Sequence, residues 1–146
     1  MRGYDAGKKL MGRKRHILVD TLGLILALEV HSADVQDRDG ARLLLEKCHS
    51  RFGWLKLIWA DSAYAGKLIE WVANLKRHCW IKLDIIRRCD DVSGFKVLPR
   101  RWVVERTFGW LSKYRRFSKD YETSTASSEA LIHIAMTRIM LARLTR

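Results

Sequence analysis

Two acidic residues, Asp61 and Glu105, stand where carboxylates could do chemistry. Asp61 ends the short apolar run Leu57-Ile58-Trp59-Ala60, which fits a buried strand, and sites in α/β proteins gather at the carboxyl ends of strands. Glu105 is the only acidic residue between Lys96 and Lys119. Carboxylates of this kind hold divalent ions on both sides of a phosphate during phosphoryl transfer on nucleic acids. The two positions are therefore candidate metal ligands and catalytic residues.

Each carboxylate also has a purely structural interpretation. Asp61 precedes Ser62-Ala63-Tyr64 and could cap a helix or turn. Glu105 could pair with Arg101 one helical turn earlier, an interaction of a few tenths of a kcal/mol. Gly109, one turn after Glu105, leaves room for a close backbone or phosphate approach, although glycine costs a helix about 1 kcal/mol relative to alanine. From spacing alone, both interpretations stay open at both positions.

The other acidic residues of the first forty have simpler explanations. Asp20 lies in Asp20-Thr21-Leu22-Gly23 between two apolar runs, where its side chain is expected to bond to the backbone of a turn. A further group, Asp34, Asp37 and Asp39, precedes a helical pattern. These residues are interpreted as turn and capping residues.

The charge of the chain indicates a polyanionic partner. Lys and Arg number 28 against 16 Asp and Glu, a net charge of +12, and the basic residues fall into two clusters, over 1–20 and 96–119. A solvated face explains one such cluster, but two favour contacts with DNA phosphates. The candidate DNA-binding residues are Lys8, Lys9, Arg13, Lys14, Arg15, Arg100, Arg101, Arg106, Lys113, Arg115 and Arg116.

Length and composition exclude several other classes of protein. At 146 residues, 48% of them hydrophobic, the chain can bury a core as one domain over 1–146. Its longest apolar stretch, 17–30, is interrupted by Asp20 and Glu29, so no membrane span is expected. No secretory signal follows Met1. The three cysteines lack paired spacing, which favours buried thiols over a zinc site or disulfides. A cytoplasmic location is expected.

Hydrophobic periodicity predicts the elements that would position the candidate residues. A β-hairpin is expected over 15–31, a helix from the 34–39 region to about 50–53, and a strand over 55–60 that ends at Asp61. A helix over 67–78, a strand over 80–86, a Glu105 helix over 100–118 starting after Pro99, and a C-terminal helix over 128–144 follow. Val104, Phe108 and Leu111 form an apolar stripe interpreted as core. The alternation predicts the α/β class.

Several ordered motifs resemble the DDE transposases of bacterial insertion sequences, in their fourth and fifth families. The match covers nearly the whole chain. Its motifs are Gly3-Tyr4-Asp5-Ala6-Gly7-Lys8-Lys9, Gly12-Arg13-Lys14-Arg15-His16-Ile17-Leu18-Val19-Asp20-Thr21-Leu22-Gly23, Ala33-Asp34-Val35-Gln36-Asp37-Arg38-Asp39-Gly40, Trp59-Ala60-Asp61 with Tyr64-Ala65-Gly66, and Arg100-Arg101-Trp102-Val103-Val104-Glu105-Arg106-Thr107-Phe108-Gly109-Trp110-Leu111.

The resemblance implies an RNase H-like fold and a site of two Asp and one Glu that holds Mg²⁺, or Mn²⁺ as a substitute. Asp61 matches the second Asp and Glu105 matches the Glu. Arg101 matches the family's arginine, while its tyrosine and lysine positions fall on Leu98 and on Ser112, next to Lys113. The implied activity is cleavage and strand transfer of DNA at insertion-sequence ends and target DNA, by a homo-oligomer.

The family's first catalytic Asp belongs to a strand upstream of Gly3-Tyr4-Asp5, and Asp5 and Asp20 match other family positions. The domain is therefore expected to be partial, lacking a central strand between the hairpin and the Asp61 strand, so that two strand edges are left unpaired. Two interpretations stay open: a truncated copy, or a downstream frame that is joined by frameshifting to an upstream-frame product. Alone, the chain is expected to be inactive, and the alternative is a non-catalytic remnant that binds DNA by charge.

Overall fold

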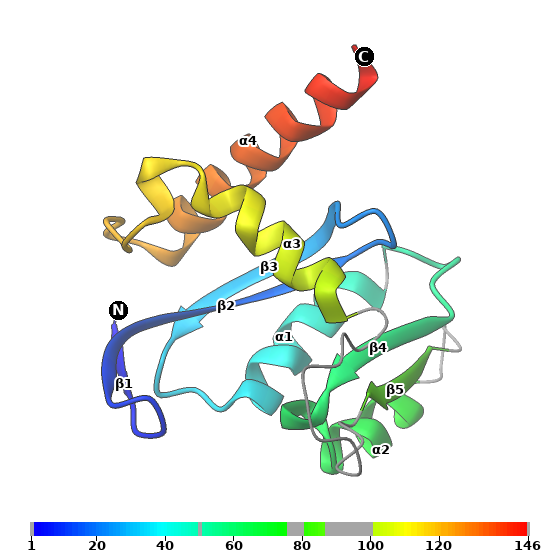
Figure 1. Cartoon of the computed structure of the whole chain (residues 1–146). Helices are drawn as coiled ribbons and strands as arrows, with labels where there is room; N and C mark the ends of the chain where they lie inside the picture. Colours follow the sequence, from blue (N-terminus) through cyan, green and yellow to red (C-terminus); the bar gives the residue numbers. More distant parts are fainter. Residues whose placement is uncertain (1, 50, 76–80, 87–100, 146) are drawn as a thin grey trace, which may run out of the picture.

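Helices and strands alternate along the chain in the computed structural model, which describes residues 2–49, 51–75, 81–86 and 101–145 (Figure 1). This alternation confirms the predicted α/β class. The elements are β1 (Gly3–Asp5), β2 (Leu10–Val19), β3 (Ile25–Ser32), α1 (Asp37–His49), β4 (Leu57–Asp61), α2 (Lys67–Asn74), β5 (Lys82–Ile86), α3 (Arg101–Ser112) and α4 (Thr125–Leu144). Within the described ranges, none of the helices has the length and apolarity that crossing a membrane requires.

Three helices differ from their predicted bounds. The helix predicted over 67–78 ends at Asn74, with Leu75 as its C-cap. The helix predicted over 100–118 ends at Ser112, because Tyr114 takes an extended backbone (φ −90°, ψ 119°) before a 3₁₀ turn at Arg115–Phe117. The C-terminal helix begins at Thr125 rather than at 128. Its cap is Ser124, whose hydroxyl oxygen accepts a hydrogen bond from the backbone N–H of Ser127 at 3.0 Å.

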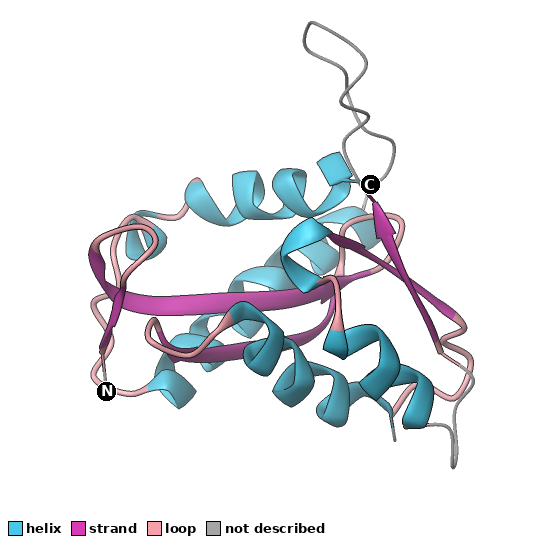
Figure 2. Cartoon of the chain, turned by 90° about the horizontal axis from the view of Figure 1, so that it is seen from below, coloured by secondary structure: helices cyan, strands magenta, loops and turns pink. Residues whose placement is uncertain are grey.

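The strands form two separate sheets among the described residues. β1, β2 and β3 are antiparallel in that order, while β4 and β5 pair in parallel, with Asp61 opposite Ile86. The edge of β2 that faces away from β3, from Arg13 to Val19, has no strand partner in the described part, and neither has the edge of β4 that faces away from β5. Figure 2 shows the strands of the two sheets as separate groups of magenta ribbons. Two unpaired edges were expected from the sequence.

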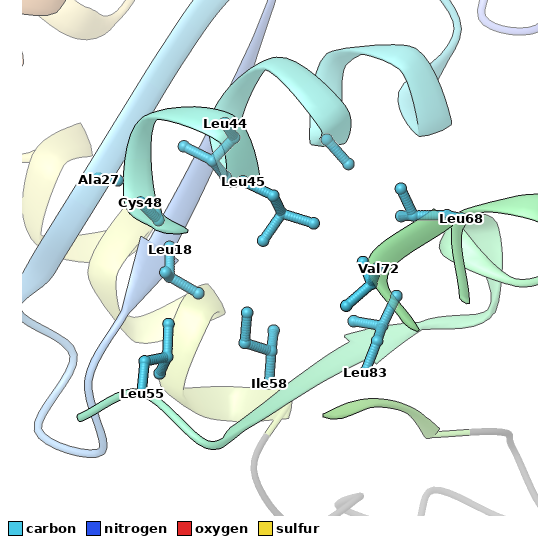
Figure 3. Close-up of a cluster of buried hydrophobic side chains, with 11 residues drawn as sticks. Leu18, Ala27, Leu44, Leu45, Cys48, Leu55, Ile58, Leu68, Val72 and Leu83 are labelled. Carbon is cyan, nitrogen blue, oxygen red and sulfur yellow. The ribbon is translucent and has the colours of Figure 1, made fainter. Parts of the chain in front are cut away.

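The hairpin of β2 and β3 is buried on both faces. One face packs with α1, α2, β4 and β5, and Figure 3 shows this cluster. Its buried residues are Leu18, Ala27, Ala41, Leu44, Leu45, Cys48, Leu55, Ile58, Leu68, Val72 and Leu83. The other face packs with α3 and α4 through Ile25, Leu28, Val30, Leu111, Ile132, Ala135 and Met136. The hairpin is thus the layer that joins the β4–β5 unit to α3.

The turn between β2 and β3 is held by Asp20, as predicted. Its Oδ1 accepts hydrogen bonds from the backbone N–H groups of Leu22 at 2.9 Å and Leu24 at 2.8 Å. Gly23 has a positive φ of 81°, which glycine adopts without steric cost. The fully buried Thr107 of α3 donates its hydroxyl to the Gly23 carbonyl at 2.7 Å. This bond ties α3 to the turn.

Position 40 in α1 has no space for a side chain, because two buried imidazoles lie against Gly40. His16 and His31 stack with ring centroids 4.7 Å apart, and a Cβ on Gly40 would overlap the Nε2 atoms of both rings. We expect Gly40→Ala to lower the free energy of unfolding by about 1–3 kcal/mol, as overpacked cores do. Urea unfolding measures this loss.

The matched control for Gly40→Ala is Gly109→Ala in α3. No heavy atom lies within 4 Å of the Cβ position of Gly109, so alanine there should raise stability by about 1 kcal/mol through helix propensity. If Gly40→Ala and Gly109→Ala shift the unfolding midpoint in the same direction, the two histidines do not restrict Gly40.

Candidate active site

A groove between the two sheets brings Asp61 and Glu105 to one place. This β2–β4 groove is a cavity of about 300 Å³ under the unpaired edges of β2 and β4. It is lined by Arg15–Leu18 of β2, Ala41, Leu44 and Leu45 of α1, Ile58–Asp61 of β4, Tyr64, Leu68, Leu83, Ile86, and Val104, Glu105 and Phe108 of α3. Two carboxylates from distant parts of the chain therefore share one cavity.

Asp61 caps a turn, as one of its two interpretations predicted, and it also lines the groove. Its Oδ1 accepts a hydrogen bond from the backbone N–H of Ala63 at 2.9 Å and caps the 3₁₀ turn Ser62–Tyr64. At the same time the half-buried side chain lines the β2–β4 groove at the end of β4. The cap occupies one carboxylate oxygen, which leaves the second available to a ligand.

Glu105 lies on the exposed side of α3, over the groove. Residues three apart on a helix are neighbours, so Glu105 lies between Trp102 and Phe108, which are 43% and 37% exposed. The Thr107 bond to Gly23 fixes the helix on which Glu105 stands. The alternative interpretation pairs Glu105 with Arg101, whose side chain is not among those that the structure describes.

His16 supports the turn that Asp61 caps. Its Nδ1 lies 2.9 Å from the hydroxyl of Tyr64, the last residue of that turn. Burial, with smaller contributions from the charges of Asp61 and Asp37, raises the pKa of Tyr64 well above its usual value. Burial, together with the neighbouring His31, lowers the pKa of His16 to about 4. Both groups are therefore neutral at neutral pH.

The low pKa of His16 predicts a loss of stability in mild acid. Its pKa is about 4 in the folded protein against 6.5 for the ordinary side chain, so the unfolded chain binds the proton more readily. The stabilisation is complete above about pH 6.5 and is lost as the pH falls towards 4, by about 3 kcal/mol in total. Urea unfolding across this range measures it.

A His16→Phe variant isolates this contribution from the other titrating groups. Phenylalanine fills the buried position and binds no proton, so the fall in stability between about pH 6.5 and 4 should be smaller by about 3 kcal/mol. His133→Gln on exposed α4 is the control and should keep the full fall. Equal pH dependence in His16→Phe and the unmodified chain would contradict the assignment.

The predicted DNA-binding residues fall into two groups by exposure. Lys8, Lys9, Lys113, Arg115 and Arg116 are exposed, and the Arg116 guanidinium pairs with Glu122 at 2.7 Å. Arg15 is half-buried, with its guanidinium 5.7 Å from the ring centroid of Phe117. Arg100 lies outside the described residues, as does the side chain of Arg101. Lys8, Lys9, Lys113 and Arg115 are thus exposed to solvent, whereas Arg116 would have to leave Glu122 to reach a phosphate.

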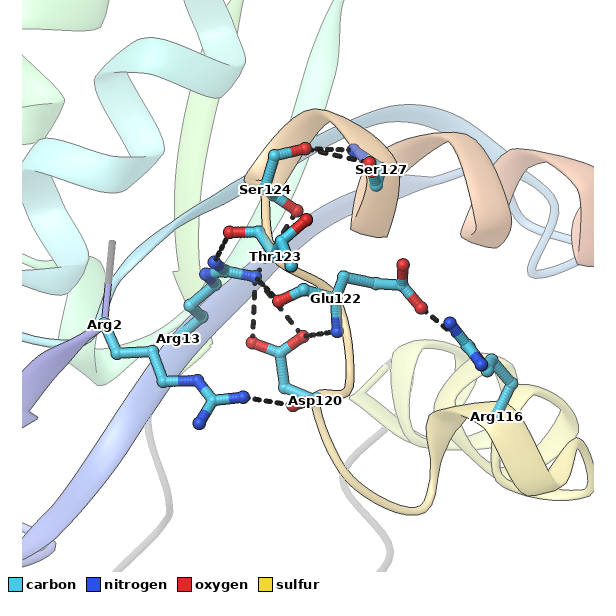
Figure 4. Close-up of polar contacts among 8 residues, drawn as sticks. All are labelled: Arg2, Arg13, Arg116, Asp120, Glu122, Thr123, Ser124 and Ser127. Atoms are coloured by element: carbon cyan, nitrogen blue, oxygen red, sulfur yellow. Dashed lines mark hydrogen bonds and ion pairs between the residues drawn. The ribbon is translucent and has the colours of Figure 1, made fainter.

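Three of the predicted contacts bind other parts of the protein instead. The side chain of Arg13 is 3% exposed, pairs with Asp120 at 3.1 Å and donates to backbone carbonyls of residues 122–124 (Figure 4). Lys14 pairs with Asp37 at 3.1 Å and with Asp5 at 3.6 Å. Arg106 stacks on Trp102, with its guanidinium carbon 4.2 Å from the ring centroid. Their predicted contact with DNA remains a prediction.

A second cavity adjoins the β2–β4 groove on the side of the basic turn. This basic cavity has a volume of about 540 Å³. Its lining includes Lys8, Arg13–Arg15, Asp5, Asp37 and Ala63, and it shares Arg15, His16, Asp61, Tyr64 and Phe108 with the groove. Asp61 thus lines both cavities, whereas Glu105 lines the β2–β4 groove.

Sequence reasoning missed Phe108 and Tyr64 as residues of the site. The apolar stripe placed Phe108 in the core with Leu111, but Leu111 is 2% exposed and Phe108 is 37% exposed. Phe108 follows Glu105 by three residues, and residues three apart lie on the same face of a helix. This spacing could have placed Phe108 beside Glu105 from the sequence.

Asp61 and Glu105 are the candidate donors for a divalent ion. Among the described residues, no group of three or more His, Cys, Asp and Glu side chains could hold a metal ion. Asp61 and Glu105 are the carboxylates that line the groove, and carboxylate oxygens are the ligands that Mg²⁺ accepts, usually one or two of them with water and phosphate. The two residues therefore fit part of a magnesium site.

Comparisons with known proteins point to one family. Residues 1–140 match the family model described as "Transposase DDE domain". A Brucella ovis protein named as a transposase for insertion sequence element IS6501 is 29% identical over 133 residues, which cover 90% of this chain and 99% of that protein. No solved structure matches the chain.

Proposed function

Because the chain belongs to the family of transposases with a DDE domain, we propose that it cuts and joins insertion-sequence DNA with Mg²⁺ when an upstream segment completes its site. The observation that carries this proposal is that Asp61 and Glu105, the two acidic positions that resemble the family's site, line one groove. The basic cavity opens beside that groove, where the phosphates of a DNA strand would be neutralised.

Asp61 and Glu105 would hold the divalent ion, with Mn²⁺ as a substitute for Mg²⁺. A bound divalent ion stabilises the negative charge that develops on the oxygens of a reacting phosphate. Asp61 is kept in place by its cap on Ala63 and by the His16–Tyr64 contact below the turn. Glu105 is kept in place by the buried Thr107 bond. The cap thus holds the Asp61 carboxylate, while the Thr107 bond fixes the helix that carries Glu105.

The unpaired edges of β2 and β4 support the proposed upstream segment. A strand laid between them would hydrogen-bond to two neighbours and cover the apolar part of the groove, formed by residues such as Leu18, Leu45 and Ile58. If it ran parallel to β4, its carboxyl end would lie beside Asp61. An acidic residue there would supply the third carboxylate of an RNase H-like core.

The test is a DNA cleavage assay with the protein produced together with its upstream segment. The substrate carries both ends of the insertion sequence. Cleaved ends and joined products are expected in Mg²⁺ or Mn²⁺ and none with the metal chelated. The 146-residue chain alone should give none in either condition. Absence of metal-dependent products from the completed protein would refute the proposed activity.

The alternative function is a DNA-binding remnant that acts by charge alone. The observation that favours it is that two carboxylates, rather than three, converge among the described residues, while the net charge is +12. A remnant would bind duplexes of unrelated sequence equally, and the logarithm of its affinity would fall with the logarithm of salt concentration by about 0.9 per phosphate contact. Preference for the insertion-sequence ends would exclude it.

In either function the proposed location is the cytoplasm, and the active form is proposed to be a homo-oligomer.

A further inference from the structure

We propose that the basic cavity is a subsite for single-stranded DNA, in which one unpaired base stacks on Phe108 while its flanking phosphates lie near Lys8 and Arg15. This inference rests on the proposed function, since it concerns the strand that enters the Asp61–Glu105 groove. The proposed function needs only the carboxylates and the basic residues. The inference adds a role for Phe108.

Phe108 is placed for stacking. Its ring is 37% exposed on α3, although neighbouring Leu111 and Thr107 on the same helix are 2% and 0% exposed. It lines both the β2–β4 groove and the basic cavity, so it stands at their junction. An exposed aromatic ring there offers a π-face to a base, and such stacking tolerates any base.

The cavity has the size and the charge for a nucleotide. Its volume of about 540 Å³ falls within the range of about 300–1,000 Å³ that small-molecule sites occupy. The Lys14 ammonium pairs with Asp37 and Asp5, and the Arg13 guanidinium pairs with Asp120. The lining cations proposed for phosphates are therefore Lys8 and Arg15, whose guanidinium lies 5.7 Å from the Phe117 ring centroid. The lining also holds the carboxylates of Asp5, Asp37 and Asp61, which repel phosphate. Lys8 and Arg15 would therefore hold the backbone while the base lies on Phe108.

Single-stranded DNA fits this arrangement better than duplex DNA. In a duplex both faces of each base are covered by stacked neighbours, so Phe108 could reach a base only after it had left the stack. In a single strand the faces are accessible, and proteins that bind single strands combine a cationic groove with aromatic platforms. The Phe108 ring and the Lys8–Arg15 cations supply both parts.

The experiment measures binding of the 146-residue chain to two fluorescent single strands of equal length, one with bases and one with abasic sites throughout. Phe108→Ala should weaken binding of the strand with bases about ten-fold, the range that alanine substitution at stacking residues produces, and leave the abasic strand unaffected. Phe108→Trp should restore or strengthen binding. Trp54→Ala is the matched control, because Trp54 is 62% exposed but does not line the basic cavity.

The outcomes separate this inference from the proposed function. If Phe108→Ala binds both strands as the unmodified chain does, or weakens both equally, the stacking subsite is refuted while charge-driven DNA binding stands. If the unmodified chain binds neither strand, DNA binding itself fails and the inference fails with it. The binding experiment needs neither metal nor cleavage, so its result does not depend on the outcome of the cleavage assay. A ten-fold loss confined to the strand with bases supports the subsite.

Discussion

Glu105→Gln is expected to abolish DNA cleavage and strand transfer by the completed protein. Glutamine keeps the size of the side chain but removes the charge that would hold a divalent ion. Changes to groups that merely support metal ligands cost about 10–100-fold, so loss of a ligand should lower the rate at least about 100-fold. The measurement is formation of cleaved and joined products from DNA carrying the insertion-sequence ends, in Mg²⁺.

The control for Glu105→Gln is Glu46→Gln, because Glu46 is an exposed carboxylate on α1 that does not line the groove. It should retain full activity. Asp61→Asn should match the loss in Glu105→Gln, although the amide can keep the cap on Ala63. Both site variants should still bind DNA, because the proposed phosphate contacts are made by other residues. Undiminished strand transfer by Glu105→Gln would overturn the assignment of the site.

Arg13→Met is expected to cost about 3–5 kcal/mol of stability, the loss that follows when one partner of a buried ion pair is removed. The guanidinium pairs with Asp120 at 3.1 Å and donates to the carbonyls of Thr123 at 2.8 Å and Glu122 at 3.0 Å. Methionine fills the space but leaves these acceptors without a donor. Since domains of this size are stable by about 5–15 kcal/mol, urea unfolding should shift clearly.

The control for Arg13→Met is Arg38→Met, on the exposed side of α1, which should change stability by less than about 0.5 kcal/mol. Arg13→Lys should fall between the two, because an ammonium keeps the charge but not the planar fork of donors. If Arg13 instead contacted phosphate, Arg13→Met would leave the free energy of unfolding unchanged. It would reduce the slope of log affinity against log salt concentration by about 1, the value of one phosphate contact. That result would reverse the assignment.

Prediction from sequence was most successful where the physics is local. The Asp20 turn follows from side-chain hydrogen bonds to residues two and four positions away, and the end of β4 at Asp61 follows from the run of apolar residues before it. Helix bounds were less accurate, because Ser124 and Ser127 are both good caps and their neighbourhood alone did not distinguish them.

Prediction was least successful where a side chain's role depends on distant segments. Arg13 sits among basic residues that suggested DNA contact, but the loop at 120–124 folds over it. Phe108 belongs to an apolar stripe, but α3 lies at the rim of a groove and leaves that ring exposed. Neither fact is encoded in the residues next to them along the chain.

By itself the sequence determined the α/β class, the net charge of +12 and the two acidic positions that resemble a DDE site, because these depend on composition, periodicity and ordered motifs. Only the tertiary structure decided that Asp61 and Glu105 share a groove, that the edges of β2 and β4 lack strand partners among the described residues, and which cations are exposed. The physical reason is that burial and proximity arise from packing between segments far apart in the chain, whereas hydrogen-bonded turns and hydrophobic periodicity arise within a few residues.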